Sequence, residues 1–430
     1  MRTRGGRKYL GGIAAAVCMA TVTMALVVPD VAGAATSTSG APGVTSNKIT
    51  IGAVGIQSGP IAGTFDGFVP GMRAYFDMVN AKGGVNGRKI SLPTSLYKNT
   101  GGTASAFTSL AKQLVEQDHV FAIAASTFVA SAPGFLGQTG VPTYGFNTSG
   151  NWTPTPNLFA YGGSVLFYTS LGPEAGYLMK QTKTNKVGFL AYNVTGSKPA
   201  CTAEAKAMKK LGIAVGFENL SAGIGSTYSS TVQRMKSAGV NFIISCMQAT
   251  DNVSLSRSIQ QYGLKAKQFW LTGGGQTLIN KYPQLMTGVY MGMTSVPFAA
   301  PTKYYPGLNE YLTNMKKYAP QFVNTQNGVR GWVSGALLVA GLRKVGKNVT
   351  QAKLIQATNK LNDFTATGFT TVTRWTSAHT KSVGPWCVGY VVVKNKQMEP
   401  VFNTGHQVFR CFNLHSTTPV PAPAGTPGAT

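Results

Sequence analysis

The segment from Lys48 to Ile90 constrains the fold more than any other part of this 430-residue chain. It contains a short apolar run, a polar break at 57–60, an amphipathic stretch and the pair Gly83-Gly84. These are typical of a buried parallel strand, a turn, a helix with one buried face and a left-handed helix stop. Ligands of open α/β sheets bind beyond the carboxyl ends of the strands. The sequence therefore predicts a ligand-facing loop at Gln57-Ser58-Gly59.

Strand and helix patterns alternate along most of the chain, and the alternation restarts near Lys186. This repetition predicts an α/β unit built twice, each around a parallel sheet. Later in the chain we expect helices at Leu308–Tyr318 and Arg330–Val345 and a hairpin-like strand pair at Trp386–Val393 and Met398–Val401.

The two ends of the chain differ in composition from the part between them. Residues 1–34 place basic residues before an apolar run and the sequence Ala32-Gly33-Ala34, which is the pattern of a cleaved secretory signal. The apolar run is also long enough for a retained membrane anchor, and Cys18 leaves a lipoprotein signal open. Residues 35–47 are predicted to be a linker and 416–430 a disordered tail, because both are rich in small residues and proline. We therefore expect an exported protein, extracellular or associated with the cell envelope.

Four cysteines follow the signal region, and an even number in an exported chain favours disulfides over metal or redox roles. Three pairings are possible. We prefer Cys201–Cys246, which would tie a helix start to a neighbouring strand, and Cys387–Cys411, which would close the C-terminal strand pair. Four separate buried thiols are the alternative.

The charge balance is strongly basic, with 38 Lys and Arg against 12 Asp and Glu, a formal net charge of +26. The basic residues are spread along the chain, whereas a nucleic-acid module clusters them on one face, so we expect no nucleic-acid partner. Two explanations remain open. The surface is held near an anionic cell-wall polymer or lipid, or carboxylates were dispensed with because they would be protonated in an acidic exterior.

The opening segment and Thr227–Gly263 resemble the type I periplasmic binding proteins, in particular the branched-chain amino-acid receptor group. These are the extracellular solute receptors of ABC importers. The resemblance covers nearly the whole mature chain and implies two Rossmann-like α/β lobes joined by a three-crossing hinge, the Venus-flytrap architecture. It places lobe 1 at 48–165 plus 298–370 and lobe 2 at 166–297 plus 371–415. It puts the crossings near 163–167, 295–299 and 368–374.

On the first lobe, polar residues follow three of the expected strands. The resemblance implies that hydroxyl residues there hold the carboxylate of an amino acid, and backbone N–H groups at helix starts favour the same anion. Ordinary turn and capping chemistry is the alternative for each single residue. The candidate ligand-binding residues of this lobe are Ser58, Ser126, Thr127, Asn147 and Ser149.

On the second lobe, the sequence departs from the amino-acid receptors. The two tyrosines of the family align with about Gly196 and Gln248, and its acidic ammonium partner aligns with the uncharged stretch Gly273-Gly274-Gly275. Gln248 and Gly273 are the candidate ligand-binding residues here. An unpaired ammonium in a closed cleft would cost several kcal/mol. Asp251 and Glu204 are the nearest carboxylates that would compensate, although Asp251 also fits as the cap of a helix beginning near Asn252.

A ligand without a free ammonium fits this pattern better: an amide, a small acid, or a ring or polyol stacked on an aromatic side chain. Each of the candidate aromatics also fits a place in the core. They are Phe65, Phe128, Trp152 and Tyr161.

The sequence shows no pattern of catalysis, because the four histidines are scattered and no carboxylate pair or metal-ligand spacing appears. We expect no enzyme activity, cofactor or metal. The predicted function is that of a monomeric substrate-binding protein of an ABC importer, which captures a small solute by hinge closure and docks on the permease subunits in the membrane. A ligand-sensing or cell-wall-retained module without a transport partner is the alternative.

Overall fold

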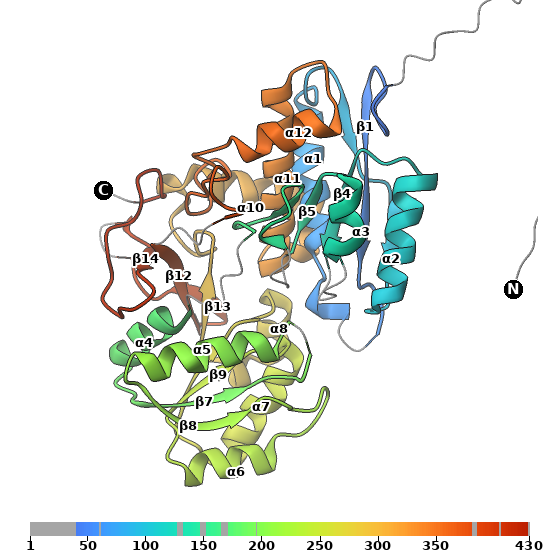
Figure 1. The fold of residues 1–430 in the computed structure, drawn as a ribbon. Coiled ribbons are helices and arrows are strands. Elements are labelled where there is room, and N and C mark those ends of the chain that lie inside the picture. The colour runs from blue at the N-terminus through green and yellow to red at the C-terminus, as the bar shows by residue number, and fades with distance from the viewer. Residues whose placement is uncertain are drawn as a thin grey trace, which may run out of the picture. The chain divides into compact units, whose positions relative to one another are not determined.

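The computed structural model describes residues 40–59, 62–126, 132–146, 152–164, 171–194, 196–380, 385–403 and 406–428. Residues 41–430 form a compact unit with two β-sheets (Figure 1). The predicted signal peptide at 1–34 lies outside the described residues, as does most of the predicted linker.

The first sheet has six parallel strands in the order β2-β1-β4-β5-β6, with β3 also paired to β1. Its strands are β1 (Lys48–Gly55), β2 (Lys89–Ser91), β3 (Tyr97–Asn99), β4 (Ala122–Ser126), β5 (Thr143–Gly145) and β6 (Leu158–Ala160). The helices around it are α1 (Phe68–Ala81), α2 (Ala104–Lys112), α3 (Ala132–Thr139), α10 (Pro306–Tyr318), α11 (Gln326–Val345) and α12 (Gln351–Asn359).

Both faces of this sheet are buried, because alternate residues of a strand point to opposite faces. Ile49 and Ile51 pack in the cluster that includes α1 and α11, whereas Val54 packs in the cluster that includes α2 and α3. This is why the opening strand is apolar on both faces, as a parallel strand between two helix layers must be.

The second sheet has eight strands in the order β13-β12-β11-β10-β9-β7-β8, with β14 also paired to β12. Its strands are β7 (Lys186–Leu190), β8 (Ala214–Asn219), β9 (Phe242–Ser245), β10 (Lys267–Trp270), β11 (Val289–Met293), β12 (Trp386–Lys394), β13 (Gln397–Pro400) and β14 (Phe409–Phe412). The first five of these are parallel, and the last three are antiparallel additions from the end of the chain.

Helices cover both faces of the second sheet as well. Its helices are α4 (Leu171–Gln181), α5 (Lys198–Lys210), α6 (Ser229–Ser237), α7 (Ala249–Gln261), α8 (Gln276–Lys281) and α9 (Pro283–Met286). The helices α4 and α5 pack on one face and α6 and α7 on the other. The two-lobed α/β fold that the sequence predicted is thus confirmed.

The chain passes between the two sheets three times: between β6 and α4, between β11 and α10, and between α12 and β12. The second and third connections run side by side. Ser295 and Thr370 form an antiparallel bridge, and the Val296 N–H donates to the Phe369 carbonyl at 2.8 Å. A pair of hydrogen-bonded connections of this kind is the form of a hinge.

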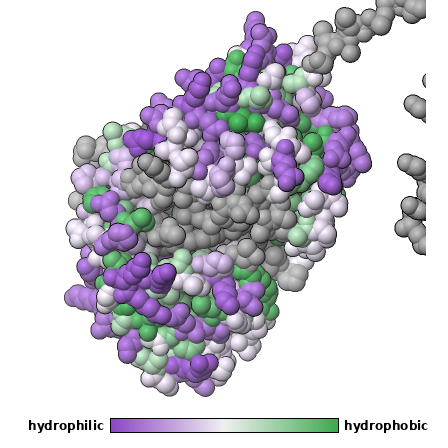
Figure 2. Space-filling view, viewed as in Figure 1, coloured by the Kyte–Doolittle hydropathy of each residue, from purple (hydrophilic) through white to green (hydrophobic). Residues whose placement is uncertain are grey.

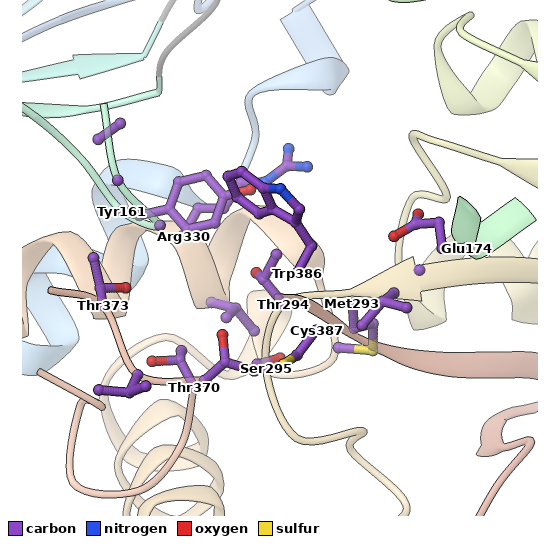
Figure 3. Close-up of a pocket in the computed structure, with 18 of the residues that line it drawn as sticks. Tyr161, Glu174, Met293, Thr294, Ser295, Arg330, Thr370, Thr373, Trp386 and Cys387 are labelled. Carbon is purple, nitrogen blue, oxygen red and sulfur yellow. The ribbon is translucent and has the colours of Figure 1, made fainter. Parts of the chain in front are cut away.

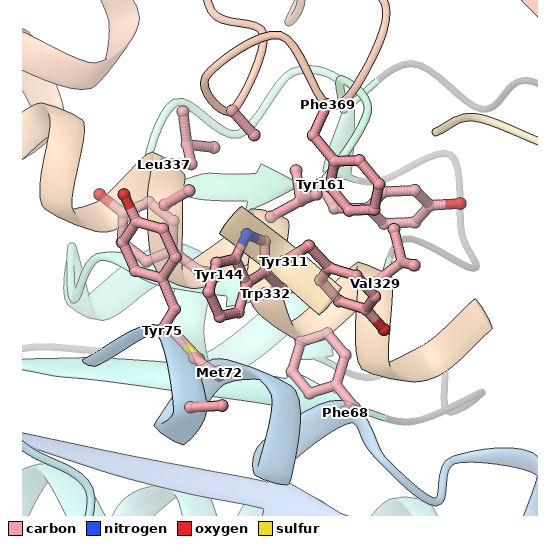
Figure 4. Packing of buried hydrophobic residues seen from close by; sticks show 14 of the residues in the cluster. Phe68, Met72, Tyr75, Tyr144, Tyr161, Tyr311, Val329, Trp332, Leu337 and Phe369 are labelled. Carbon is pink, nitrogen blue, oxygen red and sulfur yellow. The ribbon is translucent and has the colours of Figure 1, made fainter. Parts of the chain in front are cut away.

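The first lobe is held together by an aromatic cluster between α1, α10 and α11 (Figure 4). Trp332 of α11 lies edge-on to Tyr75 at 4.9 Å and to Tyr311 at 5.5 Å between ring centroids. Tyr311 in turn stacks on Phe369 of the third connection at 4.7 Å. The core of the lobe therefore reaches directly to the hinge.

Both preferred cysteine pairs are disulfides in the structure. Cys201–Cys246 joins the first turn of α5 to the end of β9, and Cys387–Cys411 joins the directly paired strands β12 and β14. Removal of a native disulfide typically costs about 2–5 kcal/mol in small exported domains.

The sequence predicted disorder at 416–430, and the described part of this tail instead makes defined contacts with the second lobe. The Val420 N–H donates to the Cys411 carbonyl at 2.8 Å, and Thr417 accepts from Lys180 at 2.6 Å. Composition alone misled here, because backbone pairing with a strand needs no apolar periodicity.

The described surface in Figure 2 is mostly hydrophilic, with apolar residues scattered in small groups. Among the helices of the described ranges, none has the length and apolar character that crossing a membrane requires. Those ranges also contain no cluster of three or more His, Cys, Asp or Glu arranged to hold a metal ion.

Candidate functional site

A cavity of about 190 Å3 lies between the two lobes, beside the paired connections. The first lobe contributes residues from the end of β6 and the first turns of α11, and the second lobe contributes the ends of β10 and β11 and the start of β12 (Figure 3). Its main polar and aromatic lining residues are Tyr161, Glu174, Thr294, Ser295, Gln326, Arg330, Thr370, Thr373, Arg374 and Trp386. Both lobes and the paired connections thus meet at one cavity.

Arg374 and Arg330 are the cations of the cavity lining. Arg330 lies on the second turn of α11. Its guanidinium lies 4.6 Å from the ring centroid of Phe146 and 5.6 Å from that of Tyr161, and the two rings stack with an interplanar angle of 4°. Its Nη1 donates to Asn327 Oδ1 at 2.9 Å. Cation–π contacts fix the guanidinium in place without neutralising its charge.

Three buried polar atoms of the cavity lining have no hydrogen-bond partner: Ser295 Oγ, Thr370 Oγ1 and Trp386 Nε1. Ser295 is 1% exposed and Thr370 is 5% exposed. A buried polar group without a partner costs about 1–3 kcal/mol. Such groups need a partner that the protein does not supply, either an ordered water or a bound molecule.

Glu174 lines the opposite end of the cavity from Arg330 and Tyr161 (Figure 3). Burial, together with repulsion from Glu204, raises the pKa of Glu174 well above its usual range. Burial in the cavity wall thus disfavours the negatively charged form of this carboxyl group.

Gln326 links the two lobes next to the cavity. Its Oε1 accepts from the Gly273 N–H at 3.3 Å, and its Nε2 donates to the Gly292 carbonyl at 3.1 Å. The Gln276 N–H also donates to the Asn324 carbonyl at 3.1 Å. The start of α11 is therefore in direct contact with the strand ends of the second lobe.

The predicted ligand residues are placed as follows on the first lobe. Ser58 is exposed and accepts from Asn99 Nδ2 at 2.7 Å, and Ser126 is fully buried at the end of β4 with no partner for its hydroxyl. Thr127, Asn147 and Ser149 lie outside the described residues. Neither Ser58 nor Ser126 lines the cavity beside the hinge, so their role in ligand binding stays a prediction.

On the second lobe, Gln248 is the N-cap residue of α7, and its backbone N–H donates to the Tyr192 hydroxyl at 3.2 Å. Gly273 approaches the cavity through its bond to Gln326. A Cβ on Gly273 would lie 1.8 Å from Met291 Sδ, so any side chain here would require the buried Met291 side chain of β11 to move. The roles of both residues in ligand binding likewise stay predictions.

Of the candidate aromatic residues, one lines the cavity and others are buried in the core. Tyr161 lines the cavity, whereas Trp152 is 1% exposed and packs in the core between the first sheet, α2 and α3. Phe65 is 4% exposed and lies edge-on to Phe146 at 6.0 Å, behind the ring that Arg330 covers. Phe128 lies outside the described residues.

The sequence offered two roles for Asp251, the partner of a ligand ammonium or the cap of a helix beginning near Asn252. The structure gives it a different role. The helix α7 begins at Ala249, so Asp251 lies inside its first turn. Its Oδ2 accepts a short hydrogen bond from the Tyr192 hydroxyl and a bond from the Gly225 N–H at 3.0 Å. The carboxylate therefore ties β7, α7 and the loop before α6 together.

Replacing Asp251 by alanine is expected to destabilise the protein by about 2 kcal/mol, because the buried Tyr192 hydroxyl and the Gly225 N–H lose their acceptor. Urea unfolding at pH 7, followed by circular dichroism, measures this change. Asp363→Ala is the control, since Asp363 is exposed and surface substitutions usually stay within about 0.5 kcal/mol. Equal effects of the two substitutions would show that Asp251 holds nothing together.

Glu204 does not face the cavity either. It lies on the buried side of α5 with 0% exposure, and neither carboxyl oxygen has a hydrogen-bond partner. Burial raises its pKa to about 8. It is thus unable to serve as the ammonium partner that the sequence left open.

Sequence reasoning missed Arg330, Ser295, Thr370 and Trp386 as site residues, because it placed the site only at strand ends. Arg330 lies inside a helix, and the others lie on or next to the hinge connections. The run Thr370-Thr371-Val372-Thr373 was a signal, since four β-branched residues with three hydroxyls are unusual in an exposed loop.

Comparison with known proteins decides the family. A family model described as periplasmic binding protein matches residues 48–395. The chain belongs to this family. The predicted membership is confirmed, and it places the chain in a family of exported solute-binding proteins rather than enzymes.

The relatives are distant but cover most of the chain. The Leu/Ile/Val-binding protein homolog 3 of Brucella melitensis is 24% identical over 322 residues, which cover 72% of this chain and 82% of that protein. A fatty acid ABC transporter substrate-binding protein from Thermomonospora curvata has a TM-score of 0.73 at 18% identity and covers 91% of this chain and 98% of its own. A solute binding protein of an R. palustris ABC transporter, solved with benzoate, has a TM-score of 0.69 at 13% identity, over 83% of this chain and 96% of its own.

Proposed function

We propose that this protein is the substrate-binding component of an ABC importer, which captures a small solute between its lobes. The observation that supports this most directly is the cavity that both lobes and the hinge connections line. Family membership supports it independently. The permease subunits in the membrane are the proposed partner.

Capture follows from the position of the cavity. A solute that contacts Arg330 on the first lobe and the start of β12 on the second binds most tightly when the lobes are closed. Binding therefore shifts an open–closed equilibrium toward the closed form. The paired segments around Ser295 and Thr370 would absorb the motion, since they connect the lobes.

The proposed solute is a small molecule such as an amide or a small organic acid. The uncharged stretch at Gly273 and the engaged carboxylate of Asp251 offer no partner to an ammonium group. Glu174 lines the cavity, but burial raises its pKa and so disfavours the charged form that would pair with an ammonium. The cavity volume of about 190 Å3 is below the range of roughly 300–1,000 Å3 of drug-sized ligand sites, which favours a compact solute.

A thermal-shift screen of the purified protein tests this proposal. The panel spans amino acids, amides, small carboxylates, sugars and aromatic acids. We expect at least one class to raise the melting temperature, because a ligand at 100 times its Kd stabilises the folded state by about 2.7 kcal/mol. Small-angle scattering with the hit is expected to show compaction. A panel without any shift would count against solute capture and favour a module without transport.

A further inference from the structure

The cavity beside the hinge contains a cation that nothing in the described protein neutralises. Every Asp and Glu except Asp30 lies in the described ranges, and none of them forms an ion pair with Arg330. The Arg330 side chain is half-buried against Phe146 and Tyr161. Partial desolvation of a guanidinium without a counter-ion costs free energy in the empty site. An anion that enters the site offsets this cost.

Uncharged groups of the same cavity lining fit the same kind of ligand. Ser295, Thr370 and Trp386 each offer a hydroxyl or indole donor that is buried without a partner. An indole N–H donates only, and hydroxyls adapt to an acceptor. Planar Arg guanidinium pairs with carboxylates through two parallel hydrogen bonds, which is the strongest form of this contact.

Apolar side chains form another part of the lining, and Arg374 is the second cation there. Phe269, Leu271, Met293 and Val329 all line the space. Glu174, at the far end, would oppose an anion only if it were ionised, and burial raises its pKa, which disfavours the ionised form. A solute therefore fits this lining if its carboxylate lies at Arg330 and the part of it that extends toward Glu174 is uncharged.

We propose that this cavity binds a compact monocarboxylic acid that has an apolar body and no ammonium group, with Arg330 as the residue that holds the carboxylate. This inference rests on the proposed function, because it names the solute class of the same site. The sequence predicted that the solute carboxylate binds at the strand-end loops around Ser126. The present proposal places that carboxylate at α11 and the hinge instead. The carboxylate itself then joins the lobes, since Arg330 belongs to the first lobe and Trp386 to the second.

Two matched pairs of ligands test the chemistry by isothermal titration calorimetry at pH 7. Benzoate and benzamide differ in the negative charge, and 4-methylpentanoate and leucine differ in the ammonium group. The panel also includes straight-chain monocarboxylates of four to ten carbons. We expect a monocarboxylate to bind and its amide or ammonium counterpart to bind at least about 10-fold more weakly.

Substitution of Arg330 tests the residue. Arg330→Gln is expected to weaken carboxylate binding by about 10- to 100-fold, and Arg330→Lys by less, because lysine keeps the charge and loses the two-pronged contact. Arg234→Gln is the control. Arg234 also lies over an aromatic ring, Phe217, at 5.1 Å, but outside this cavity, so its loss should leave the affinity unchanged.

A second variant keeps the test valid if Arg330→Gln fails to fold. Thr370→Val removes a buried hydroxyl that has no partner in the empty site. It should leave the melting temperature of the free protein unchanged or raised, and it should weaken carboxylate binding several-fold.

The outcomes separate this inference from the proposed function. Binding of leucine or an amide with compaction, but of no monocarboxylate in the panel, would overturn the inference and leave solute capture intact. Carboxylate binding that is unchanged in Arg330→Gln and Thr370→Val would overturn the assignment of the anchor. Binding of no solute at all would remove both proposals together.

Discussion

Replacing Glu204 by glutamine should stabilise the protein at pH 8 by several kcal/mol and leave its stability at pH 4 nearly unchanged. Glu204 is fully buried and has no hydrogen-bond partner for either oxygen. Burial alone raises its pKa from 4.5 to about 8. Each unit of pKa shift corresponds to about 1.36 kcal/mol, so the full effect has a ceiling of about 5 kcal/mol.

The sign follows from proton binding. Between pH 4.5 and about 8 the folded protein keeps the Glu204 proton, whereas the unfolded chain has lost it. Stability therefore falls as pH rises through this window, and the contribution is fully present only below the lower value. Glutamine resembles the protonated acid in shape and cannot ionise, so the variant lacks this loss.

Urea unfolding of both proteins between pH 4 and 9 measures the effect. The free energies of unfolding should coincide at the acidic end and diverge as the pH rises. Glu116→Gln is the control, because Glu116 is an exposed carboxylate and its curve should run parallel to that of the wild type. A constant offset between Glu204→Gln and wild type across the whole range would contradict the pH linkage.

This buried acid bears on the unusual composition of the chain. The sequence left two explanations for 38 basic against 12 acidic residues: retention by an anionic polymer, or an acidic exterior. Glu174 shares the raised pKa, because it is buried near Glu204. The raised pKa values of these two groups give a contribution to stability that is lost as the pH rises, which agrees with an acidic exterior.

Much of the fold could be predicted from sequence, because parallel sheets between helix layers leave strong periodic signals. The apolar run before Ser58 is β1, and the pattern after Lys186 restarts as β7 and its neighbours. The helix expected at Arg330–Val345 begins four residues earlier, at Gln326, because Thr325 caps it by accepting from the Gly328 N–H.

The site was harder to predict than the fold, because it depends on contacts between distant segments. Ser295 and Thr370 are 75 positions apart and meet only through the paired hinge connections. Arg330 carries no local signal, since an arginine on a helix is usually a solvated surface residue. Asp251 was misjudged for the same reason: its partner Tyr192 comes from another strand end.

Replacing Gly331 by alanine is expected to destabilise the protein by about 3 kcal/mol or more. A Cβ on Gly331 would lie 1.8 Å from the Phe68 carbonyl oxygen and 3.0 Å from the Met72 nitrogen. Both are backbone atoms of α1, so no side chain is able to move aside and the two helices must separate. Overpacking typically costs about 1–3 kcal/mol, and backbone clashes lie at or above the top of that range.

A graded series of alanine substitutions separates this clash from the general effect of adding a methyl group. Gly335→Ala meets Tyr75 Cβ at 3.2 Å and should cost less than Gly331→Ala. Gly134→Ala in α3 meets nothing within 4 Å and should be neutral or stabilising by about 0.4–1 kcal/mol. Urea unfolding at pH 6 gives the three values. Because Arg330 precedes Gly331 on α11, separation of the helices should also weaken solute binding. A loss at Gly331 no larger than the change at Gly134 would mean that the spacing of α1 and α11 is not fixed by this glycine, and the anchoring of Arg330 would then need another support.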